Sequence, residues 1–292
     1  MNKKAFPKDF YDFDQLKRYA KDIAEVYKSE KQKSEALEAG NQQMVKYAAD
    51  LNKTVSELKA VNQELREAYI DTIHRLVLAA EYKDEDTGNH IKRISRYSAL
   101  IAEKMGLPAS EVQDILYASP MHDVGKVGVP DSMLIKPGRL TEQEFECIKA
   151  HTIIGADILA NSRGKILRVA EQIAISHHEK WNGKGYPNGL SKDRIPLVGR
   201  IVGLADVFDA LTSRRPYKDP YPVEVACDMI KKERGQHFDP DLVDIFMKNI
   251  DEILSIKEEM DSKEVVSTFD FTWSERDLAS NIHKRESTTL SR

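Results

Sequence analysis

Two adjacent pairs of residues in the sequence combine histidine with a second metal-binding side chain at a predicted helix end. His122 is followed by Asp123, and His177 by His178, each pair at the end of a predicted helix. The backbone leaves helical geometry at such an end, so two neighbouring side chains can point at one ion. His151 lies at the end of a further predicted helix, and a carboxylate such as that of Asp123 can bridge two ions. The pairs therefore indicate a centre with more than one metal ion.

An acid within an apolar helix strengthens this interpretation. Asp206 lies in the segment GRIVGLADVFDAL, where a carboxylate is costly unless it is paired, protonated or bound to metal. Any one of these residues alone is more often structural than a ligand, but together they favour a metal site. The candidate ligands lie at helix ends or on buried faces: His90, His122, Asp123, His151, His177, His178 and Asp206. Nitrogen and oxygen donors without thiolate favour Fe, Mn or Zn.

The bulk composition is that of a globular protein with a strongly charged part. The 292 residues are 41% hydrophobic and 32% charged, and the net charge of -4 gives no reason to expect duplex nucleic acid as a partner. No run approaches the roughly 18 apolar residues of a membrane helix. The two cysteines, Cys147 and Cys227, lack the spacing of a disulfide scaffold. We therefore expect a cytoplasmic protein.

The first third of the chain is polar and carries a heptad repeat. One heptad position holds Leu37, Met44, Leu51, Leu58, Leu65, Thr72 and Ala79. The other holds Asn41, Ala48, Val55, Asn62, Tyr69 and Leu76. A spacing of 3.5 residues over several heptads predicts a coiled coil over 31–80, and hence a homodimer. The alternative is a single amphipathic helix that lies on its own domain.

Helical spacing continues through residues 81–260. One apolar stripe consists of Ile91, Ile94, Tyr97, Ile101 and Met105. Ser110 is expected to cap the helix that follows, and the segment TEQEFECIKAHTIIGADILA opens with Thr141 and Glu144 at capping-box spacing. Asp239 and Pro240 begin another helix. No run alternates cleanly with period two, so the domain is predicted to be all-α, with its ligands gathered between helices.

The candidate ligands belong to an ordered set of motifs between about Ile70 and Met260. The set includes DEDTGNH, PMHDVGKVGVPDSMLIKPGRLTEQEFECIKAHTIIGADIL, HHEKWNGKGYPNGL, IPLVGRIVGLADVFDALTSRRPYK and FDPDLVD. It resembles the HD-GYP family of metal-dependent phosphohydrolases, a branch of the HD superfamily whose members hydrolyse the bacterial second messenger cyclic di-GMP. The resemblance implies an all-helical catalytic domain over 81–260. A segment 1–30 and the coiled coil would precede this domain, and a polar tail, 261–292, would follow it.

The resemblance also implies a ligand set for two or three divalent ions, Fe or Mn. One ion is expected at His90, His122, Asp123 and Asp206, as in mononuclear HD enzymes. A second is expected at His151, His177 and His178, with Asp123 as the bridge. A third ion would use Asp86, where Glu is common in the family. The alternative role for Asp86 is that of an N-cap for the helix that follows.

Substrate contacts and a reaction follow from the same resemblance. Lys126, Arg215 and Lys218 are expected to bind phosphate, Arg through a two-pronged fit and Lys as a point charge. Tyr186 of the GYP element is expected to stack on guanine or to hydrogen-bond to phosphate. Asp123, Lys126 and Tyr186 are the catalytic candidates. The implied reaction is attack on phosphorus by a metal-bound hydroxide, which gives linear pGpG and, after a second cut, GMP.

Three other functions stay open. The substrate could be another nucleotide, such as cyclic GMP-AMP or a guanosine polyphosphate. Alternatively, the domain could bind cyclic di-GMP or a partner protein without hydrolysis. In the third alternative, the chain is chiefly a dimerising output module whose coiled coil relays a signal. The expected partners are cyclic di-GMP, a second copy of the chain, and a regulatory or GGDEF-domain protein. Neither duplex nucleic acid nor a membrane is expected as a partner.

Overall fold

Helices provide the regular structure in the computed structural model, which describes residues 13–81, 83, 88–136, 138–214 and 219–262. These ranges contain no strand, which confirms the all-α prediction. The chain divides into two units, Met1–Ala68 and Tyr69–Arg292. Helix α1 (Phe13–Glu81) contributes to both units. None of the described helices combines the length and the apolar character that a membrane span requires.

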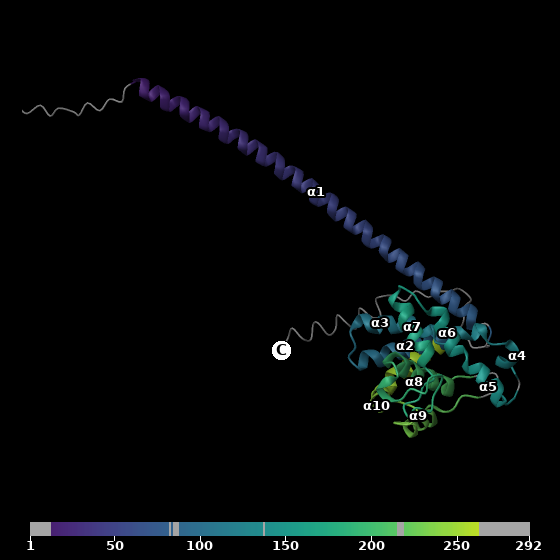
Figure 1. The fold of residues 1–292 in the computed structure, drawn as a ribbon. Coiled ribbons are helices and arrows are strands. Elements are labelled where there is room, and N and C mark those ends of the chain that lie inside the picture. Colours follow the sequence, from purple (N-terminus) through teal and green to yellow (C-terminus); the bar gives the residue numbers. More distant parts are fainter. Residues whose placement is uncertain (1–12, 82, 84–87, 137, 215–218, 263–292) are drawn as a thin grey trace, which may run out of the picture. The chain divides into compact units, whose positions relative to one another are not determined.

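The first unit is described from Phe13 to Ala68 and consists of α1 alone (Figure 1). The helix begins within the segment 1–30, ahead of the predicted coil. Its apolar side chains at one heptad position are exposed: Leu37, Met44, Leu51, Leu58 and Leu65. Leu16 and Ile23 extend the same heptad position toward the N-terminus and are exposed too. A long helix with exposed leucines at this spacing has the surface pattern of a coiled-coil strand.

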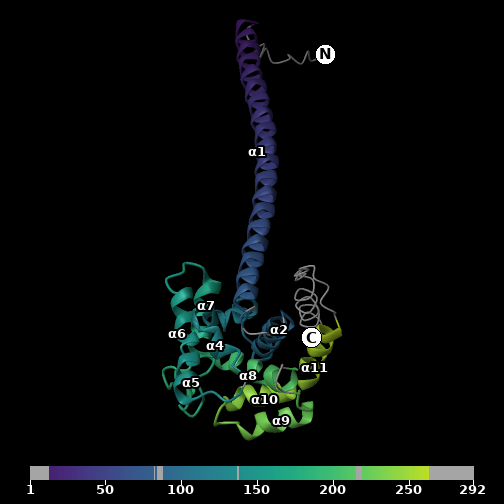
Figure 2. The same ribbon diagram turned by 90° about the vertical axis from the view of Figure 1, so that its right-hand side faces the viewer.

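The second unit is built around two helices. These are α2 (Gly88–Lys104) and α8 (Leu197–Thr212), which contact each other. On one side lie α3 (Ala109–Ala118) and α7 (Lys165–Ser176). On the other lie α9 (Val223–Lys232), α10 (Pro240–Lys248) and α11 (Ile250–Ser262), as Figure 2 shows. The remaining elements are η1 (Ser119–Met121), η2 (Val124–Gly128), α4 (Asp131–Leu134), α5 (Glu142–Lys149), α6 (His151–Leu159) and η3 (Lys192–Arg194).

Aromatic side chains join the central helices to α10. The Tyr97 and Phe208 rings meet edge to face with their centroids 5.8 Å apart, and the centroid of Phe246 lies 5.0 Å from that of Phe208. All three side chains are fully buried. Edge-to-face pairs add to the free energy that area burial alone supplies, so this contact fixes α8 relative to α2 and α10.

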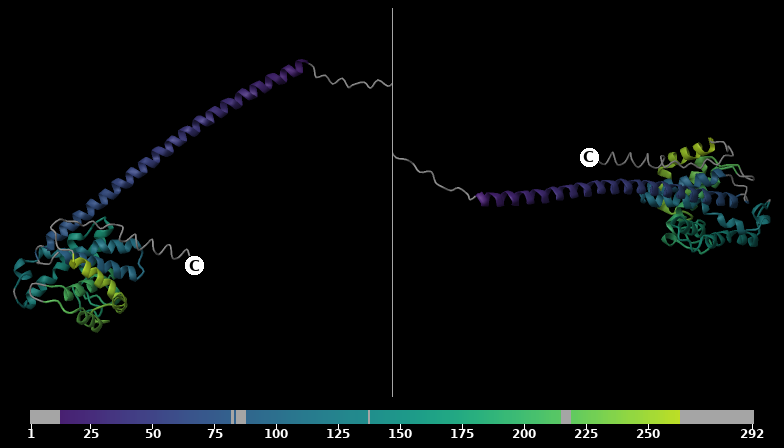
Figure 3. Two further views of the ribbon diagram at one scale, coloured as in Figure 1. Left: turned by 180° about the vertical axis from the view of Figure 1, so that it is seen from behind. Right: turned by 90° about the horizontal axis from the view of Figure 1, so that it is seen from above.

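Helix α11, drawn in yellow in Figure 3, packs against α2, and polar side chains join the two helices. Arg96 Nη1 lies 2.6 Å from the carboxylate of Glu259, and Lys104 pairs with Glu252. The Asn89 side-chain amide donates to the Met260 carbonyl over 3.3 Å. The contacts follow the length of α2, so the two helices are fixed in register.

Side-chain caps begin two of the described helices in the second unit, α5 and α10. The capping box of Thr141 and Glu144 is confirmed at the start of α5, and the Asp239 side chain accepts a hydrogen bond from Asp241 N at the start of α10. The prediction of Ser110 as an N-cap is wrong. The Pro108 carbonyl accepts the first helical bonds of α3, so the helix begins directly after it.

Candidate metal centre

Histidine and aspartate side chains of the second unit form two groups that could each hold an ion. The first group is Asp123, His151, His177 and His178. The second is His90, His122 and Asp206. Within each group, one ligand atom per residue lies within 4.8 Å of all the others. The structure therefore brings together every predicted ligand that it describes.

Helix ends supply most of these side chains. His122 and Asp123 lie in the bend between η1 and η2. His151 is the first residue of α6, because the segment that begins at Thr141 forms two helices that break at Ala150. His177 is the C-cap of α7, and His178 follows it. Asp206 lies inside α8, as the sequence predicted.

The Asp123 carboxylate lies between the two groups. Its Oδ1 atom is 3.2 Å from His151 Nε2 and 3.5 Å from His177 Nε2. Its Oδ2 atom is 3.4 Å from His122 Nε2 and 2.8 Å from Lys126 Nζ. Burial alone would raise the pKa of Asp123, but the charge of Lys126 and the contacts with His122 and His151 hold it well below its usual value. The carboxylate is thus ionised and presents one oxygen to each group.

Hydrogen bonds at Nδ1 orient three of the histidines. The Nδ1 atom of His122 donates to the Ser119 carbonyl over 2.9 Å, and that of His151 to the Ile148 carbonyl over 2.6 Å. His177 Nδ1 lies 3.1 Å from the carbonyls of both Ile173 and Ala174. A carbonyl can only accept, so each Nδ1 carries a proton, and Nε2 is the atom that each ring turns toward Asp123. Metal-binding histidines are commonly oriented in this way.

The donor set fits a divalent metal. Burial lowers the pKa of His177 and of His178, so neither ring is expected to carry a second proton. The His177 Nε2 lone pair therefore faces Asp123 Oδ1 at 3.5 Å without a proton on that nitrogen. Such a convergence of acceptors is unfavourable unless a cation lies among them. Imidazole nitrogen with carboxylate oxygen suits iron, manganese or zinc.

His90 is oriented by a partner that the sequence reasoning missed. Its Nδ1 atom donates to Asp209 Oδ2 over 2.7 Å. Arg93 donates to the same carboxylate from Nε over 2.5 Å and from Nη2 over 2.9 Å. Asp209 is fully buried, and Arg93 outweighs the effect of burial, so the pKa of Asp209 falls to about 2. The signal in the sequence is the spacing, because Arg93 follows His90, and Asp209 follows Asp206, by three residues.

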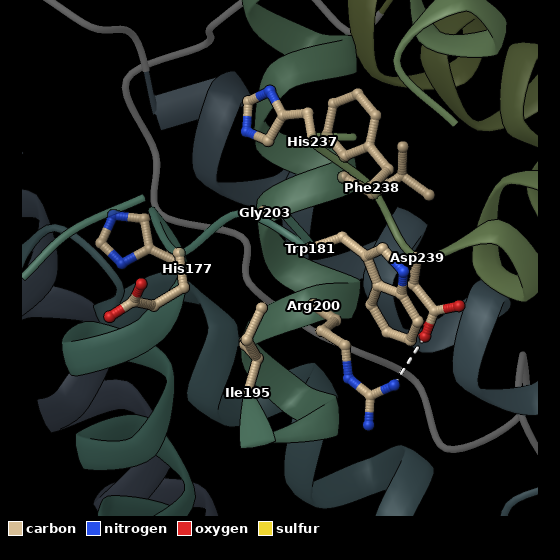
Figure 4. Close-up of a pocket in the computed structure, with 11 residues that line it drawn as sticks. His177, Trp181, Ile195, Arg200, Gly203, His237, Phe238 and Asp239 are labelled. Carbon is tan, nitrogen blue, oxygen red and sulfur yellow. Dashed lines mark hydrogen bonds and ion pairs between the residues drawn. The ribbon is translucent and has the colours of Figure 1, made fainter. Parts of the chain in front are cut away.

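Two glycines allow the close contacts behind the ligands. A Cβ atom on Gly125 would lie 1.9 Å from the His151 carbonyl oxygen and 2.4 Å from Gly155 N. A Cβ atom on Gly203 would lie 2.5 Å from the His177 carbonyl oxygen. Figure 4 shows Gly203 on α8 near His177. The backbone of His151 therefore packs directly against that of Gly125, and the backbone of His177 against that of Gly203. A side chain at either glycine would separate them.

The loop after His178 is anchored by Glu179, a second residue that the sequence reasoning missed. Its buried carboxylate accepts hydrogen bonds from Asn188 N over 2.8 Å and from Leu190 N over 2.9 Å. Tyr186 N donates to the His178 carbonyl over 3.2 Å, and the centroids of the two rings are 4.7 Å apart. The loop thus holds the predicted residue Tyr186 next to a metal-ligand candidate.

A pocket lies on the other side of His177, lined by residues that include Trp181, Arg200, His237 and Asp239 (Figure 4). Arg200 donates to Asp239 over 2.6 Å and lies 5.5 Å from the centroid of the Trp181 ring. Burial lowers the pKa of His237 to about 4, so the ring is neutral near pH 7. His237 belongs to neither ligand group among the described residues.

Three predicted site residues lie outside the described residues: Asp86, Arg215 and Lys218. Lys126 is described and lies against the Asp123 carboxylate, with a side chain that is largely buried.

Comparison with known proteins identifies the domain. Residues 76–242, more than half of the chain, match the protein-family profile described as an HD domain. The chain is 43% identical over 194 residues to the 3'3'-cGAMP-specific phosphodiesterase 2 of Vibrio cholerae, a match that covers 66% of this chain and 37% of that protein. It is 42% identical over 214 residues to a cyclic di-GMP phosphodiesterase of Thermotoga maritima, with 72% of this chain and 58% of that protein covered.

A third relative is the cyclic di-GMP phosphodiesterase response regulator RpfG of Xanthomonas campestris. The chain is 44% identical to it over 191 residues, which are 65% of this chain and 50% of that protein. The chain thus spans about half the length of the curated relatives that it matches.

Replacement of Gly125 by Ala tests the close contact with His151. The added Cβ atom would meet backbone atoms, so we expect a loss of about 1–3 kcal/mol in the free energy of unfolding and a fall in bound metal. Gly128→Ala is the matched control, because its Cβ atom would meet only the Ile154 side chain, at 3.0 Å. Elemental analysis and denaturant unfolding measure both effects. Equal metal content in the two variants would contradict this account of Gly125.

Replacement of Asp209 by Asn tests the orientation of His90. The amide keeps the shape of the side chain but removes the charge that pairs with Arg93, so metal affinity should fall by about 10- to 100-fold. The metal affinity of each variant is measured by calorimetric titration of the metal-free protein with the metal ion. Asp228→Asn, at an exposed residue of α9 that pairs with Lys231, should leave the affinity unaltered. The assignment fails if the two variants bind metal alike.

Proposed function

Because this chain belongs to the HD domain family and carries the motifs of its HD-GYP branch, we propose that it hydrolyses the phosphodiester bonds of a cyclic dinucleotide. Cyclic di-GMP is the proposed substrate and linear pGpG the first product, with GMP after a second cut. The proposal is supported by curated relatives that are named as cyclic di-GMP and cyclic GMP-AMP phosphodiesterases.

The position of Asp123 is the observation that carries this proposal. One carboxylate oxygen faces His151 and His177, and the other faces His122. An ionised, buried carboxylate between two groups of nitrogen ligands is suited to bridge two divalent ions, for which we propose iron or manganese. When bound, such ions lower the pKa of coordinated water and neutralise charge on a phosphate. A third ion at Asp86 remains a prediction.

Lys126 and Tyr186 are the described residues assigned to the substrate. The Lys126 ammonium lies 2.8 Å from Asp123 Oδ2, so its charge is available beside the cluster, where a phosphate oxygen would bind. Burial raises the pKa of Tyr186, so its hydroxyl stays protonated at neutral pH and can donate to phosphate. Arg215 and Lys218 are proposed as further phosphate contacts on the strength of the sequence motif alone.

Cyclic GMP-AMP is the second candidate substrate. The observation that favours it is the 43% identity to a relative whose name specifies that nucleotide. Both candidates share a phosphodiester linked to guanosine, so the metal centre serves either one. Turnover of cyclic di-GMP, cyclic GMP-AMP and cyclic di-AMP by the purified full chain separates them.

The first unit is proposed to form a parallel two-stranded coiled coil with a second copy. The exposed leucines of α1 at heptad spacing support this pairing, and Asn62 at the other heptad position favours two strands in register. A cytoplasmic location is consistent with the free thiols of Cys147 and Cys227. A regulatory or GGDEF-domain protein as partner stays a prediction.

Replacement of Asp123 by Asn tests the reaction. Loss of the bridging charge should remove most of the bound metal and reduce turnover of cyclic di-GMP by more than the roughly 100-fold expected for loss of an outer partner. Product chromatography and elemental analysis measure these changes in protein purified without oxygen. Asp157→Asn, at an exposed residue of α6, is the control and should behave like the unaltered protein. Full turnover by the Asp123 variant would overturn the proposal.

Substitution of both Leu51 and Leu58 by Glu tests the coiled coil. Charges in the seam should convert a dimer into a monomer, as measured by light scattering at micromolar concentration, with metal content unchanged. Lys46→Glu with Lys53→Glu introduces the same residue type at outward heptad positions and should leave the dimer intact. A monomeric unaltered protein would refute the pairing.

A further inference from the structure

Helix α5 (Glu142–Lys149) is fixed beside the metal centre by contacts other than core burial. None of its residues is buried. Its first turn is closed by the capping box, and Lys136 Nζ lies 2.7 Å from each carboxylate oxygen of Glu144. The helix ends directly before Ala150 and His151, one of the ligand candidates. It therefore forms part of the rim of the site and contributes little to the core.

An aromatic side chain on this rim remains exposed. Phe145 is 43% exposed, and its ring meets the edge of the Tyr186 ring with centroids 6.2 Å apart. The Tyr186 ring in turn lies 4.7 Å from that of His178. Lys149 Nζ is 4.9 Å from the centroid of Phe145 and 5.5 Å from that of Tyr186. Aromatic rings and one cation thus extend outward from the metal centre.

Single exposed apolar side chains are common on protein surfaces and usually need no explanation. Ile158 on α6, which is 51% exposed, is one of these. Phe145 differs because it contacts both the ring of a predicted substrate residue and an ammonium group, next to a group of metal-ligand candidates. Nucleobases stack on exposed aromatic rings, and a cation beside such a ring strengthens the attraction.

We infer that Phe145 and Lys149, together with Tyr186, form a platform for a nucleobase of the substrate while a phosphate of the same nucleotide lies at the metal centre. The inference rests on the proposed function, since it assumes a nucleotide substrate. The new elements are the two residues of α5, to which the family resemblance described above assigns no role.

The charge of Lys149 gives this platform a preference for guanine. Guanine presents two acceptors, O6 and N7, where adenine presents the acceptor N7 and an amino donor. An ammonium group donates only, so it matches both acceptors of guanine but is opposed by the adenine amino group. Lys149 pairs with Glu146 over 2.6 Å, but the Glu146 side chain is 62% exposed. Surface ion pairs contribute little free energy, so Lys149 can leave Glu146 for a nucleobase at small cost.

Phe145→Ala tests the platform during turnover. Loss of the stacking surface should raise KM for cyclic di-GMP about tenfold while kcat and bound metal stay near their original values. Phe145→Trp should restore KM, because it returns an aromatic face. Ile158→Ala controls for loss of an exposed apolar side chain. An unchanged KM in Phe145→Ala, or a loss of metal in that variant, would overturn the inference.

Product binding tests the platform without turnover. Calorimetry with the metal-loaded chain should show tighter binding of GMP than of ribose 5-phosphate, and this difference should shrink about tenfold in Phe145→Ala. The difference isolates the base, because both probes carry the phosphate and the ribose. If the unaltered protein hydrolyses no cyclic dinucleotide, the proposed function fails, and this comparison still decides the platform. If the ratio of GMP affinity to ribose 5-phosphate affinity is the same in the unaltered chain and in Phe145→Ala, the platform is refuted.

Lys149→Met tests the preference for guanine. The variant keeps an unbranched side chain over Phe145 and removes only the charge. We expect GMP to bind more tightly than AMP to the unaltered chain and this preference to be lost in the variant, with AMP affinity little altered. Elemental analysis checks that the variant retains its metal. An unaltered ratio of GMP to AMP affinity would exclude Lys149 as the source of specificity.

Discussion

The convergence of acceptor atoms on Asp123 is the constraint on which the second unit depends. A buried carboxylate and the Nε2 atoms of His122, His151 and His177 meet at a common centre. An unprotonated Nε2 facing this carboxylate, as at His177, is unfavourable in a buried site without a cation. The fold therefore needs rigid support to hold them together, and it needs positive charge to offset this unfavourable contact. Lys126 provides part of that charge within the chain.

The rigid support comes from backbone contacts at helix ends. Gly125 brings η2 against the His151 carbonyl, and Gly203 brings α8 against the carbonyl of His177. Each contact leaves no room for a side chain, so the two backbones pack directly against each other. Glu179 extends the same support to the loop that carries Tyr186, through hydrogen bonds to Asn188 N and Leu190 N.

A polar network connects the site to the outer helices. The Asp209 carboxylate accepts hydrogen bonds from both His90 and Arg93. Arg93 also donates to Asp261 of α11 over 3.1 Å. The aromatic contact of Phe208 with Phe246 anchors the same turn of α8 from the apolar side. The orientation of one ligand thus depends on α2, α8 and α11 together, and this explains why α11 is paired with α2 along its length.

Residue spacing along the chain was enough to predict the helical class and the caps at Thr141 and Asp239, and residue types were enough to propose the metal-ligand candidates. The sequence by itself also determined how three histidines are oriented, because His122, His151 and His177 each contact a carbonyl three residues earlier, within reach of local helical geometry. Only the tertiary structure decided the partner of His90, since the residue three positions earlier precedes α2 and Asp209 lies 119 residues away. The contact of Phe145 with Tyr186 likewise arises from packing between distant segments, which local spacing does not encode.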